Sequence, residues 1–177
     1  MCGILGVIET NVASRWDALT FKKALIGMSN RGPDRQKVWQ SRDGIVTFGH
    51  ARLAIQDLTT KGDQPISLND ENYCMVFNGE IYNFKDLRAD LLDKGFSFKS
   101  DSDSEVLLAA YICYGHEVLS RLNGMFAFAI YDKRDESVFL ARDPSGQKPL
   151  FYRQGPNYFE FCSTLEGLLE NINGERN

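Results

Sequence analysis

The order of short strand-like segments along the chain is the feature that most constrains its fold. Residues 125–131 and 138–141 are apolar and are joined by a charged turn at residues 132–136, a pattern typical of a β-hairpin. Further strands are predicted at residues 3–9, 45–48, 52–55, 73–77 and 158–161. Because strands and helices do not alternate strictly, the pattern argues against a doubly wound parallel sheet. It predicts an α+β fold of antiparallel sheets with helices on their outer faces.

Helices are predicted at residues 16–28, 84–94 and 104–114, and a last one opens at residues 163–166, which have capping-box spacing. Asn83 is expected to cap the second helix. The first helix is expected to bury the apolar residues Ala18, Phe21, Leu25 and Met28. The strand at residues 73–77 is expected to end at Asn78-Gly79, a dipeptide that readily takes positive φ, and two strands are expected to meet near Gly49.

Length and charge bound the classes of function. The 177 residues fit one ordinary domain, so residues 1–177 are expected to form a single domain with its own core. The formal net charge is −4 and no Lys/Arg run occurs, which argues against a nucleic-acid partner. No apolar stretch is long enough to span a bilayer and no signal peptide is evident, so no membrane partner is expected and a cytoplasmic location is predicted.

The cysteines and histidines bear on metal and redox chemistry. The chain has four widely spaced cysteines, two histidines and no Cys-x-x-Cys pair. This argues against a zinc site and against a disulfide framework, so no metal is expected. Cys74, Cys113 and Cys162 each lie in an apolar run and are interpreted as small buried hydrophobic residues.

Cys2 is different, because it directly follows the initiator methionine and precedes Gly3. Loss of Met1 would give this residue both a thiol and a free α-amine. An α-amine has an ordinary pKa of about 7.7–8.0, which suits a general base near neutral pH. The residue would then contain a nucleophile and its base. Taken alone, chance placement of a small residue near a chain end is the better explanation.

Asn78 and Gly79 also have two interpretations. A side-chain amide and an unobstructed backbone N–H are the donors that stabilise the oxyanion of an acyl-transfer reaction. From this segment alone, a simple hairpin turn is the better interpretation.

Several charged segments elsewhere could serve either the structure or the binding of a ligand. Arg52 lies in an apolar segment, where a guanidinium needs a carboxylate from an ion pair or from a ligand; the ion pair is the simpler interpretation. The acidic loop at residues 100–105 would cap a helix or capture an ammonium group, and it lacks the spacing of an EF-hand. Residues 31–34 and 142–150 are interpreted as loop scaffolding held by Arg–Asp pairs.

Seven motifs in a fixed order provide the strongest signal. They are Met1-Cys2-Gly3-Ile4, Arg31-Gly32-Pro33-Asp34, Gly49-His50-x-Arg52-Leu53, Asn78-Gly79-Glu80-Ile81-Tyr82-Asn83, Ser102-Asp103-Ser104-Glu105, Gly124-Met125-Phe126-Ala127-Phe128 and Arg142-Asp143-x-x-Gly146-x-Lys148-Pro149-Leu150. With these motifs the chain resembles the class II glutamine amidotransferase domain, which has an N-terminal cysteine nucleophile. It is most similar to the N-terminal glutaminase domain of the asparagine synthetase branch, which the Arg-Gly-Pro-Asp form favours.

The resemblance implies a four-layer αββα sandwich of the N-terminal nucleophile hydrolase type. It also implies hydrolysis of the side-chain amide of glutamine to glutamate and ammonia through a thioester on Cys2. The oxyanion hole would be formed by Asn78 and Gly79. The substrate α-carboxylate would be held by Arg52, and its α-ammonium by Asp103 and Glu80. The resemblance implies no cofactor for this half-reaction, with ATP and Mg²⁺ expected only on a synthetase partner.

The resemblance also bears on partners. The family usually joins this domain to a second one that adenylates an acceptor and consumes the ammonia, but no Ser-Gly-Gly-like pyrophosphate loop occurs in this chain. A synthetase domain or subunit is therefore expected as a partner beside glutamine, and a homodimer is a further option. Two alternatives stay open: a non-catalytic module that senses glutamine or serves in docking, and another N-terminal nucleophile amide hydrolase.

Overall fold

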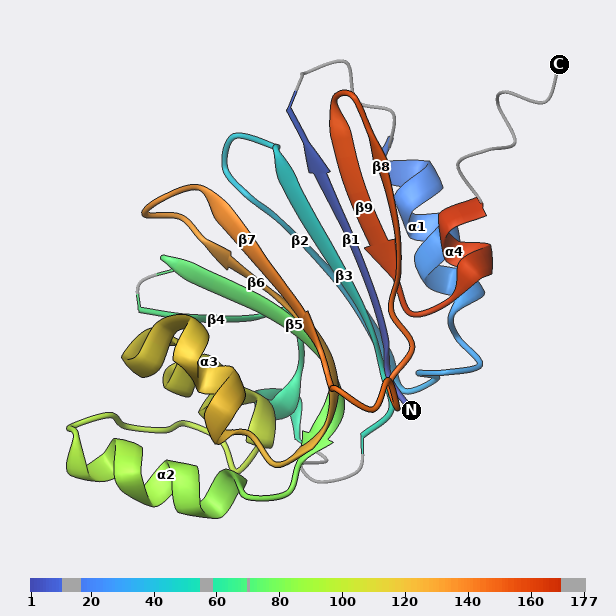
Figure 1. Cartoon of the computed structure of the whole chain (residues 1–177). Coiled ribbons are helices and arrows are strands. Elements are labelled where there is room, and N and C mark those ends of the chain that lie inside the picture. The colour runs from blue at the N-terminus through green and yellow to red at the C-terminus, as the bar shows by residue number, and fades with distance from the viewer. Residues whose placement is uncertain (11–16, 55–58, 70, 170–177) are drawn as a thin grey trace, which may run out of the picture.

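Two antiparallel sheets packed face to face form the centre of the molecule, and helices cover both outer faces (Figure 1). The computed structural model describes residues 1–10, 17–54, 59–69 and 71–169. The predicted α+β class and its four layers are therefore confirmed.

The first sheet contains, in spatial order, β2 (Arg35–Gln40), β3 (Val46–Arg52), β1 (Gly3–Glu9), β9 (Tyr158–Cys162) and β8 (Phe151–Gly155). The second contains β4 (Ile66–Leu68), β5 (Tyr73–Ile81), β6 (Gly124–Asp132) and β7 (Ser137–Arg142). All neighbouring strands in both sheets run antiparallel. The pairing of β6 with β7 is the hairpin that the apolar segments predicted.

The helices are divided between the two outer faces. Against the first sheet lie α1 (Ala18–Gly27) and α4 (Leu165–Leu169), and against the second lie α2 (Phe84–Asp93) and α3 (Asp103–Tyr114). Two short 3₁₀ helices, η1 (Thr60–Gly62) and η2 (Gly115–Arg121), complete the described elements.

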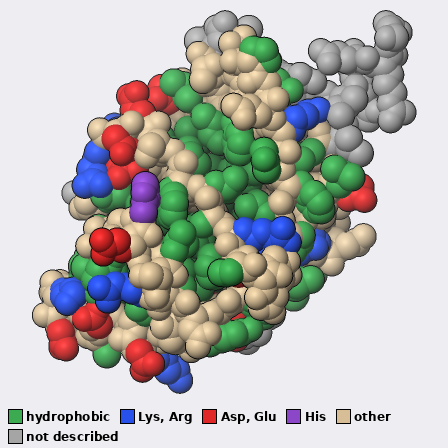
Figure 2. All heavy atoms as spheres, in the orientation of Figure 1, with side chains coloured by type: hydrophobic (Ala, Val, Ile, Leu, Met, Phe, Trp, Pro, Cys, Tyr) green, Lys and Arg blue, Asp and Glu red, His purple; other side chains and the backbone are tan. Residues whose placement is uncertain are grey.

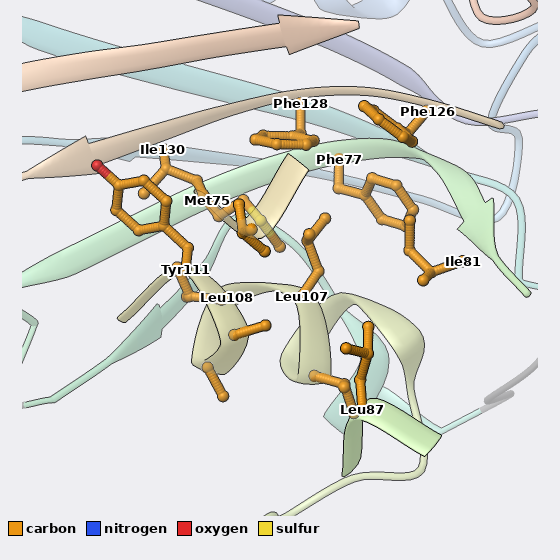
Figure 3. Close-up of a cluster of buried hydrophobic side chains, with 14 of the residues drawn as sticks. Met75, Phe77, Ile81, Leu87, Leu107, Leu108, Tyr111, Phe126, Phe128 and Ile130 are labelled. Atoms are coloured by element: carbon orange, nitrogen blue, oxygen red, sulfur yellow. The ribbon is translucent and has the colours of Figure 1, made fainter. Parts of the chain in front are cut away.

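Three buried clusters match the three interfaces between the layers. The cluster between the sheets includes Ile4, Phe48, Val76, Ala127 and Phe161. The cluster under α1 and α4 includes Leu5, Val7, Phe21, Leu25 and Leu168. The largest, under α2 and α3, includes Met75, Phe77, Leu107, Tyr111 and Phe128 (Figure 3). Side chains of a strand alternate between its faces, so β5 sends odd-numbered residues towards the helices and even-numbered residues towards the first sheet.

The core between the sheets reaches the surface along one side. On the face shown in Figure 2, hydrophobic side chains are visible in the region between the two sheets. Partly buried residues of β7, β9 and the segment before β8 pack against this core, among them Val138, Leu140, Leu150 and Phe159. Apolar surface that stays accessible in this way is common in folded proteins.

The structure corrects several predicted strands. The two strands expected around Gly49 are one continuous strand, β3. Gly49 lies inside this strand because α1 crosses it closely there: a Cβ on Gly49 would lie 2.8 Å from the Phe21 ring. The turn expected at Asn78-Gly79 is absent, because β5 continues to Ile81 with these residues opposite Ala127 and Phe126 of β6. Strand pairing has overridden the local preference for a turn. The edge strands β2, β4 and β8 were not predicted.

The helix predictions need smaller corrections. Asp17 caps α1 by accepting from Thr20 N at 2.6 Å; Ala18 is exposed, and Ala24 is buried in its place. The Asn83 side chain makes no cap hydrogen bond; it donates to the carbonyl oxygen of Arg121, the last residue of η2, and accepts from Asn123 N. The predicted helix start at residue 16 lies outside the described residues. The strand predicted at residues 52–55 is wrong beyond Arg52, because Leu53 and Ala54 lie outside any strand; residue 55 is not among the described residues.

The predicted burial of the three cysteines is nearly correct. Cys74 and Cys162 are fully buried, whereas Cys113 is only half-buried.

Candidate active site

A pocket of about 170 Å³ lies at the end of the sandwich where β1 begins and β3 ends. Gly3 of β1 is opposite Ala51 of β3, so the antiparallel register brings Cys2 beside Arg52. The last part of β5 and the first residue of α3 complete the walls. All the residues that the sequence predicted for the site line this pocket: Cys2, Arg52, Asn78, Gly79, Glu80 and Asp103.

The Cys2 thiol lies against the backbone of Leu53. Its Sγ is 3.6 Å from the Leu53 carbonyl oxygen and 3.4 Å from the Leu53 nitrogen. Arg31 Nε donates to the Cys2 carbonyl oxygen at 3.1 Å, which fixes the backbone at this end of β1. Burial raises the pKa of the thiol, although the Leu53 backbone and the positive charges of the N-terminus and Arg52 oppose this. The resting group is therefore a thiol that needs a base to become a nucleophile.

One edge of β5 faces the pocket without a neighbouring strand along its last residues. Among the described residues, β4 pairs with residues 73–75 of β5, whereas β6 covers the opposite edge along the whole strand. Alternate N–H groups of a strand point to the same edge. Phe77 N and Ile81 N point to the uncovered edge, because each donates to a side chain there. Gly79 N, midway between them, therefore points to the same edge and into the pocket.

Asn78 presents a second donor to this pocket. Its side chain is on the face of β5 that is turned towards the first sheet, from which Cys2 comes. Asn78 is 1% exposed, and its Nδ2 has no hydrogen-bond partner among the described residues. A buried donor without a partner costs about 1–3 kcal/mol, so such a group indicates where a ligand atom is expected.

Gly79 lacks a side chain because β6 lies too close. A Cβ at this position would be 2.3 Å from the carbonyl oxygen of Met125 and 2.8 Å from the Cα of Phe126. Both atoms belong to the backbone of β6, which cannot move aside locally. Position 79 therefore requires glycine because of β6, which lies on the edge of β5 opposite the pocket. The sequence did not reveal this requirement.

Arg52 forms the ion pair that was the simpler interpretation of its sequence context. Its Nη1 lies 2.5 Å from Asp63 Oδ1 and donates to the Thr59 carbonyl oxygen at 2.7 Å. Asp63 also pairs with Arg35 at 3.0 Å and Lys37 at 2.8 Å. Burial acts to raise the pKa of Asp63, but hydrogen bonds from the three cations hold it below its ordinary value. Of these four residues only Arg52 lines the pocket, where its positive charge suits a substrate carboxylate.

The opposite wall is acidic. Asp103 is 8% exposed, and its Oδ2 accepts a hydrogen bond from Ile81 N at 3.0 Å. Burial raises the pKa of Asp103 to about 6; the N–H groups of Ile81 and Ser104 oppose this shift, and the nearby charge of Glu80 adds to it. A bound ammonium would favour the charged carboxylate. The pocket therefore has opposite charges on opposite walls, as a zwitterion requires.

Five polar residues without a predicted role in the site also line the pocket: His50, Gln64, Ser102, Ser104 and Lys148. His50 Nε2 is 3.2 Å from the Phe77 carbonyl oxygen, and Gln64 Oε1 accepts from Phe77 N at 2.6 Å. Lys148 is 5% exposed, and its Nζ lies 3.4 Å from Met1 Sδ. His50 and Lys148 stand inside two of the seven motifs, which was the available signal, whereas Gln64 stands outside all of them.

The charged turns scaffold the site, but not through the predicted Arg–Asp pairs. Asp34 accepts from Ala54 N at 2.8 Å. In the later turn, Arg142 donates to the Lys148 carbonyl oxygen at 2.6 Å, and Asp143 accepts from Lys148 N at 3.1 Å. These side chains bond backbone groups instead of each other, so they hold the loop segments that carry pocket residues.

Two findings concern metals and membranes. Within the described ranges, no three His, Cys, Asp or Glu side chains are placed to hold a metal ion. No helix in those ranges is both long enough and apolar enough to cross a bilayer.

Comparison with known proteins gives one family over the whole chain. The family model described as "glutamine amidotransferase domain" matches residues 1–177. Asparagine synthetase [glutamine-hydrolyzing] 1 of Bacillus subtilis is 43% identical over 96% of this chain and 27% of its own length. The probable asparagine synthetase [glutamine-hydrolyzing] of Dictyostelium discoideum is 40% identical over 85% of this chain and 27% of its own length. The chain thus spans about a quarter of the length of these relatives.

Solved structures share the fold at lower sequence identity. The glutamine phosphoribosylpyrophosphate amidotransferase of B. subtilis has a TM-score of 0.79 at 21% identity, covering 96% of this chain and 43% of that one. A structure described as the allosteric regulatory enzyme of purine biosynthesis has a TM-score of 0.81 at 20% identity, with the same coverage of 96% and 43%.

Proposed function

This chain belongs to the glutamine amidotransferase domain family, and on that premise we propose that it hydrolyses the side-chain amide of glutamine to glutamate and ammonia. One observation carries the proposal: the unpartnered, buried Nδ2 of Asn78 lines the same pocket as the Cys2 thiol, beside the pocket-facing N–H of Gly79. Two such donors suit the oxyanion that forms when a thiolate attacks an amide carbonyl.

The charges of the pocket support a free amino acid as the substrate. In the proposal, the positively charged wall at Arg52 holds the α-carboxylate, and Asp103 with Glu80 holds the α-ammonium. Charge-assisted hydrogen bonds to both groups would select glutamine over a plain amide or over a glutamine side chain within a peptide.

The chemistry requires the α-amine of Cys2, which is free only after Met1 is removed. In the proposed reaction, this amine takes the proton of the Cys2 thiol, and the sulfur attacks the amide carbon of glutamine. The C–N bond then breaks, and the amine passes its proton to the leaving nitrogen, so that ammonia departs and a thioester remains. Water attacks the thioester, with the amine again accepting a proton, and glutamate and the thiol are restored.

The ammonia is proposed to serve an asparagine-synthetase-like amidation. The support is that the similar curated relatives are named as glutamine-hydrolysing asparagine synthetases and are about four times as long as the matched region. A synthetase domain or subunit would consume the ammonia, and ATP and Mg²⁺ would be needed there and not for glutamine hydrolysis. The homodimer and the cytoplasmic location stay predictions.

The direct test is glutamate release from glutamine by the Met1-free protein, with the intact mass recorded. Cys2→Ala should abolish release, whereas Cys113→Ala, at a half-buried cysteine outside the pocket, should leave it unchanged. A Met1-retaining preparation should be inactive, because its α-amine belongs to the wrong residue.

A substrate panel separates this function from its alternatives. Glutamine should be hydrolysed, whereas 4-carbamoylbutanoate, which lacks the α-ammonium, should be a poor substrate. Tight glutamine binding without turnover by the Met1-free protein would indicate a non-catalytic module. Equal turnover of unrelated amides would indicate another amide hydrolase.

A further inference from the structure

Both backbone groups of Phe77 at the uncovered edge of β5 are bonded by side chains from elsewhere in the fold. Gln64 Oε1 accepts from Phe77 N at 2.6 Å, and His50 Nε2 lies 3.2 Å from the Phe77 carbonyl oxygen. A carbonyl oxygen can only accept, so the hydrogen of the His50 ring is on Nε2. His50 Nδ1 is then the unprotonated nitrogen, and it is buried without a partner among the described residues.

These two bonds replace the strand that would normally hold this edge. A strand edge beyond its last partner presents unpaired N–H and C=O groups. His50 belongs to β3 of the first sheet, opposite Ile4 of β1, so its bond to Phe77 crosses from one sheet to the other. Further along the same edge, Asp103 accepts from Ile81 N. The edge is therefore held on both sides of Gly79, whose N–H points into the pocket.

His50 is unsuited to proton transfer in this position. Burial lowers the pKa of His50 to about 4, with the Phe77 carbonyl acting against the shift and the charge of Arg52 adding to it. The facing carboxylate of Asp63 acts to raise the pKa but does not offset the burial. The ring is thus neutral near pH 7, and its one hydrogen is used by Phe77.

From this geometry we propose that His50 and Gln64 are positioning residues, which clamp Phe77 so that Asn78 Nδ2 and Gly79 N stay aimed at the reacting carbonyl. The proposal rests on the proposed glutamine hydrolysis. Both residues line the pocket, but in the proposal each acts through its bond to the backbone of β5. Because oxyanion donors are needed in the transition state and not for binding the α-groups, loss of the clamp should lower kcat and leave KM nearly unchanged.

The kinetic test compares His50→Leu and Gln64→Met with the wild type. Each should lower kcat for glutamine about 10- to 100-fold, the size expected when catalytic groups are misplaced by about 1 Å. KM should change less than about twofold, because the residues proposed to bind the α-groups are intact. His50→Gln should restore most of kcat, since its amide N–H reaches the place of Nε2. Gln36→Met is the matched control, as it removes a glutamine hydrogen bond to the Leu25 carbonyl oxygen, and neither residue lines the pocket.

Readouts that need no turnover keep the proposal testable. Alkylation of Cys2 by iodoacetamide forms no oxyanion, so its rate should be the same in all variants. Nitrogen-15 NMR of the wild type should show His50 protonated on Nε2. Hydrogen exchange of the Phe77 amide should be slow in the wild type and at least tenfold faster in Gln64→Met.

The outcomes separate the clamp from the function. Three results would each overturn the clamp. The first is an unchanged kcat in His50→Leu and Gln64→Met, and the second is a KM that rises as kcat falls. The third is a hydrogen on Nδ1 of His50. An inactive wild type with the expected NMR and exchange results would instead refute glutamine hydrolysis while the Phe77 bonds stand. If a variant does not fold, the His50 tautomer and the hydrogen exchange of the Phe77 amide in the wild type still test whether the clamp exists.

Discussion

The carboxylate of Asp103 accepts a hydrogen bond of 3.0 Å from the backbone N–H of Ile81. This bond joins the first turn of α3 to the end of β5. The acidic wall of the pocket and the strand that carries Asn78 and Gly79 therefore form one connected unit. In the proposed function, ligand binding at this wall and alignment of the two donors would depend on the same side chain.

Asp103→Asn should raise KM for glutamine about 10- to 100-fold, with a smaller effect on kcat. The amide oxygen of asparagine still accepts from Ile81 N, so the backbone link remains, but the negative charge that would attract the substrate ammonium is lost. A hydrogen bond to a charged group contributes about 1.5–3 kcal/mol, which sets this range. Steady-state kinetics provide the measurement.

Asp101→Asn is the matched control for that change. The Asp101 side chain is 96% exposed in the same loop and does not line the pocket. Its KM should equal that of the wild type. An equal increase in both variants would mean that general loop charge, and not the Asp103 carboxylate, determines binding.

Glutamine use should weaken in acid through the same carboxylate. The pKa of Asp103 is about 6 in the empty pocket, so the carboxylate is neutral below that pH and loses its attraction for an ammonium. We expect kcat/KM to fall as the pH drops through about 6, and we expect Asp103→Asn to lack this limb of the profile. A limb at the same pH in the variant would assign it to another group.

The stability of the free protein should depend on pH in the opposite direction. Asp103 has an ordinary pKa of 3.8 and a folded-state pKa of about 6, so the folded state binds the proton more tightly. The resulting stabilisation is complete below 3.8 and is lost as the pH rises through 6. At pH 7 without glutamine, the free energy of unfolding of Asp103→Asn should therefore be about 1–3 kcal/mol higher than that of the wild type. Urea unfolding at pH 7 and pH 4 tests this, because the difference should vanish at pH 4.

Asn78→Ala should lower kcat about 10²- to 10³-fold, the cost of removing one oxyanion donor. The stability of the variant should change less than is usual when a buried polar side chain is truncated, since Nδ2 has no hydrogen bond to lose. Glutamate release and thermal unfolding, measured on the same sample, check both parts. A large fall in melting temperature with kcat unchanged would indicate that Asn78 only supports the strand.

Gly79→Ala should destabilise the fold severely. The added Cβ would meet the Met125 carbonyl oxygen at 2.3 Å, which forces β5 and β6 apart. We expect a loss of about 3 kcal/mol or more, within the exceptional range for single substitutions. Gly27→Ala is the control, because nothing lies within 4 Å of its Cβ in α1, and it should be neutral or slightly stabilising. Equal stability of the two variants would contradict the close approach of β6.

The strands that the sequence predicted best are those with a clear local pattern. The boundaries predicted for β1 agree with the structure, and the hairpin of β6 and β7 differs only by a residue at the strand ends. The edge strand β2 was missed because four of its six residues are polar and almost all are exposed, so no apolar alternation marked it. Asn78-Gly79 was assigned to a turn because the dipeptide favours one locally, whereas pairing with β6 decides its conformation.

The order of strands and helices along the chain predicts an antiparallel α+β fold, and the ordered motifs identify the six candidate site residues that line one pocket. How these residues are held could be read only from the three-dimensional structure. The uncovered edge of β5, the clamp on Phe77 by His50 and Gln64, and the pairing of Arg52 with Asp63 join segments far apart in the chain. The physical reason is that burial and hydrogen-bond partners arise from contacts between elements, and local residue patterns do not specify them.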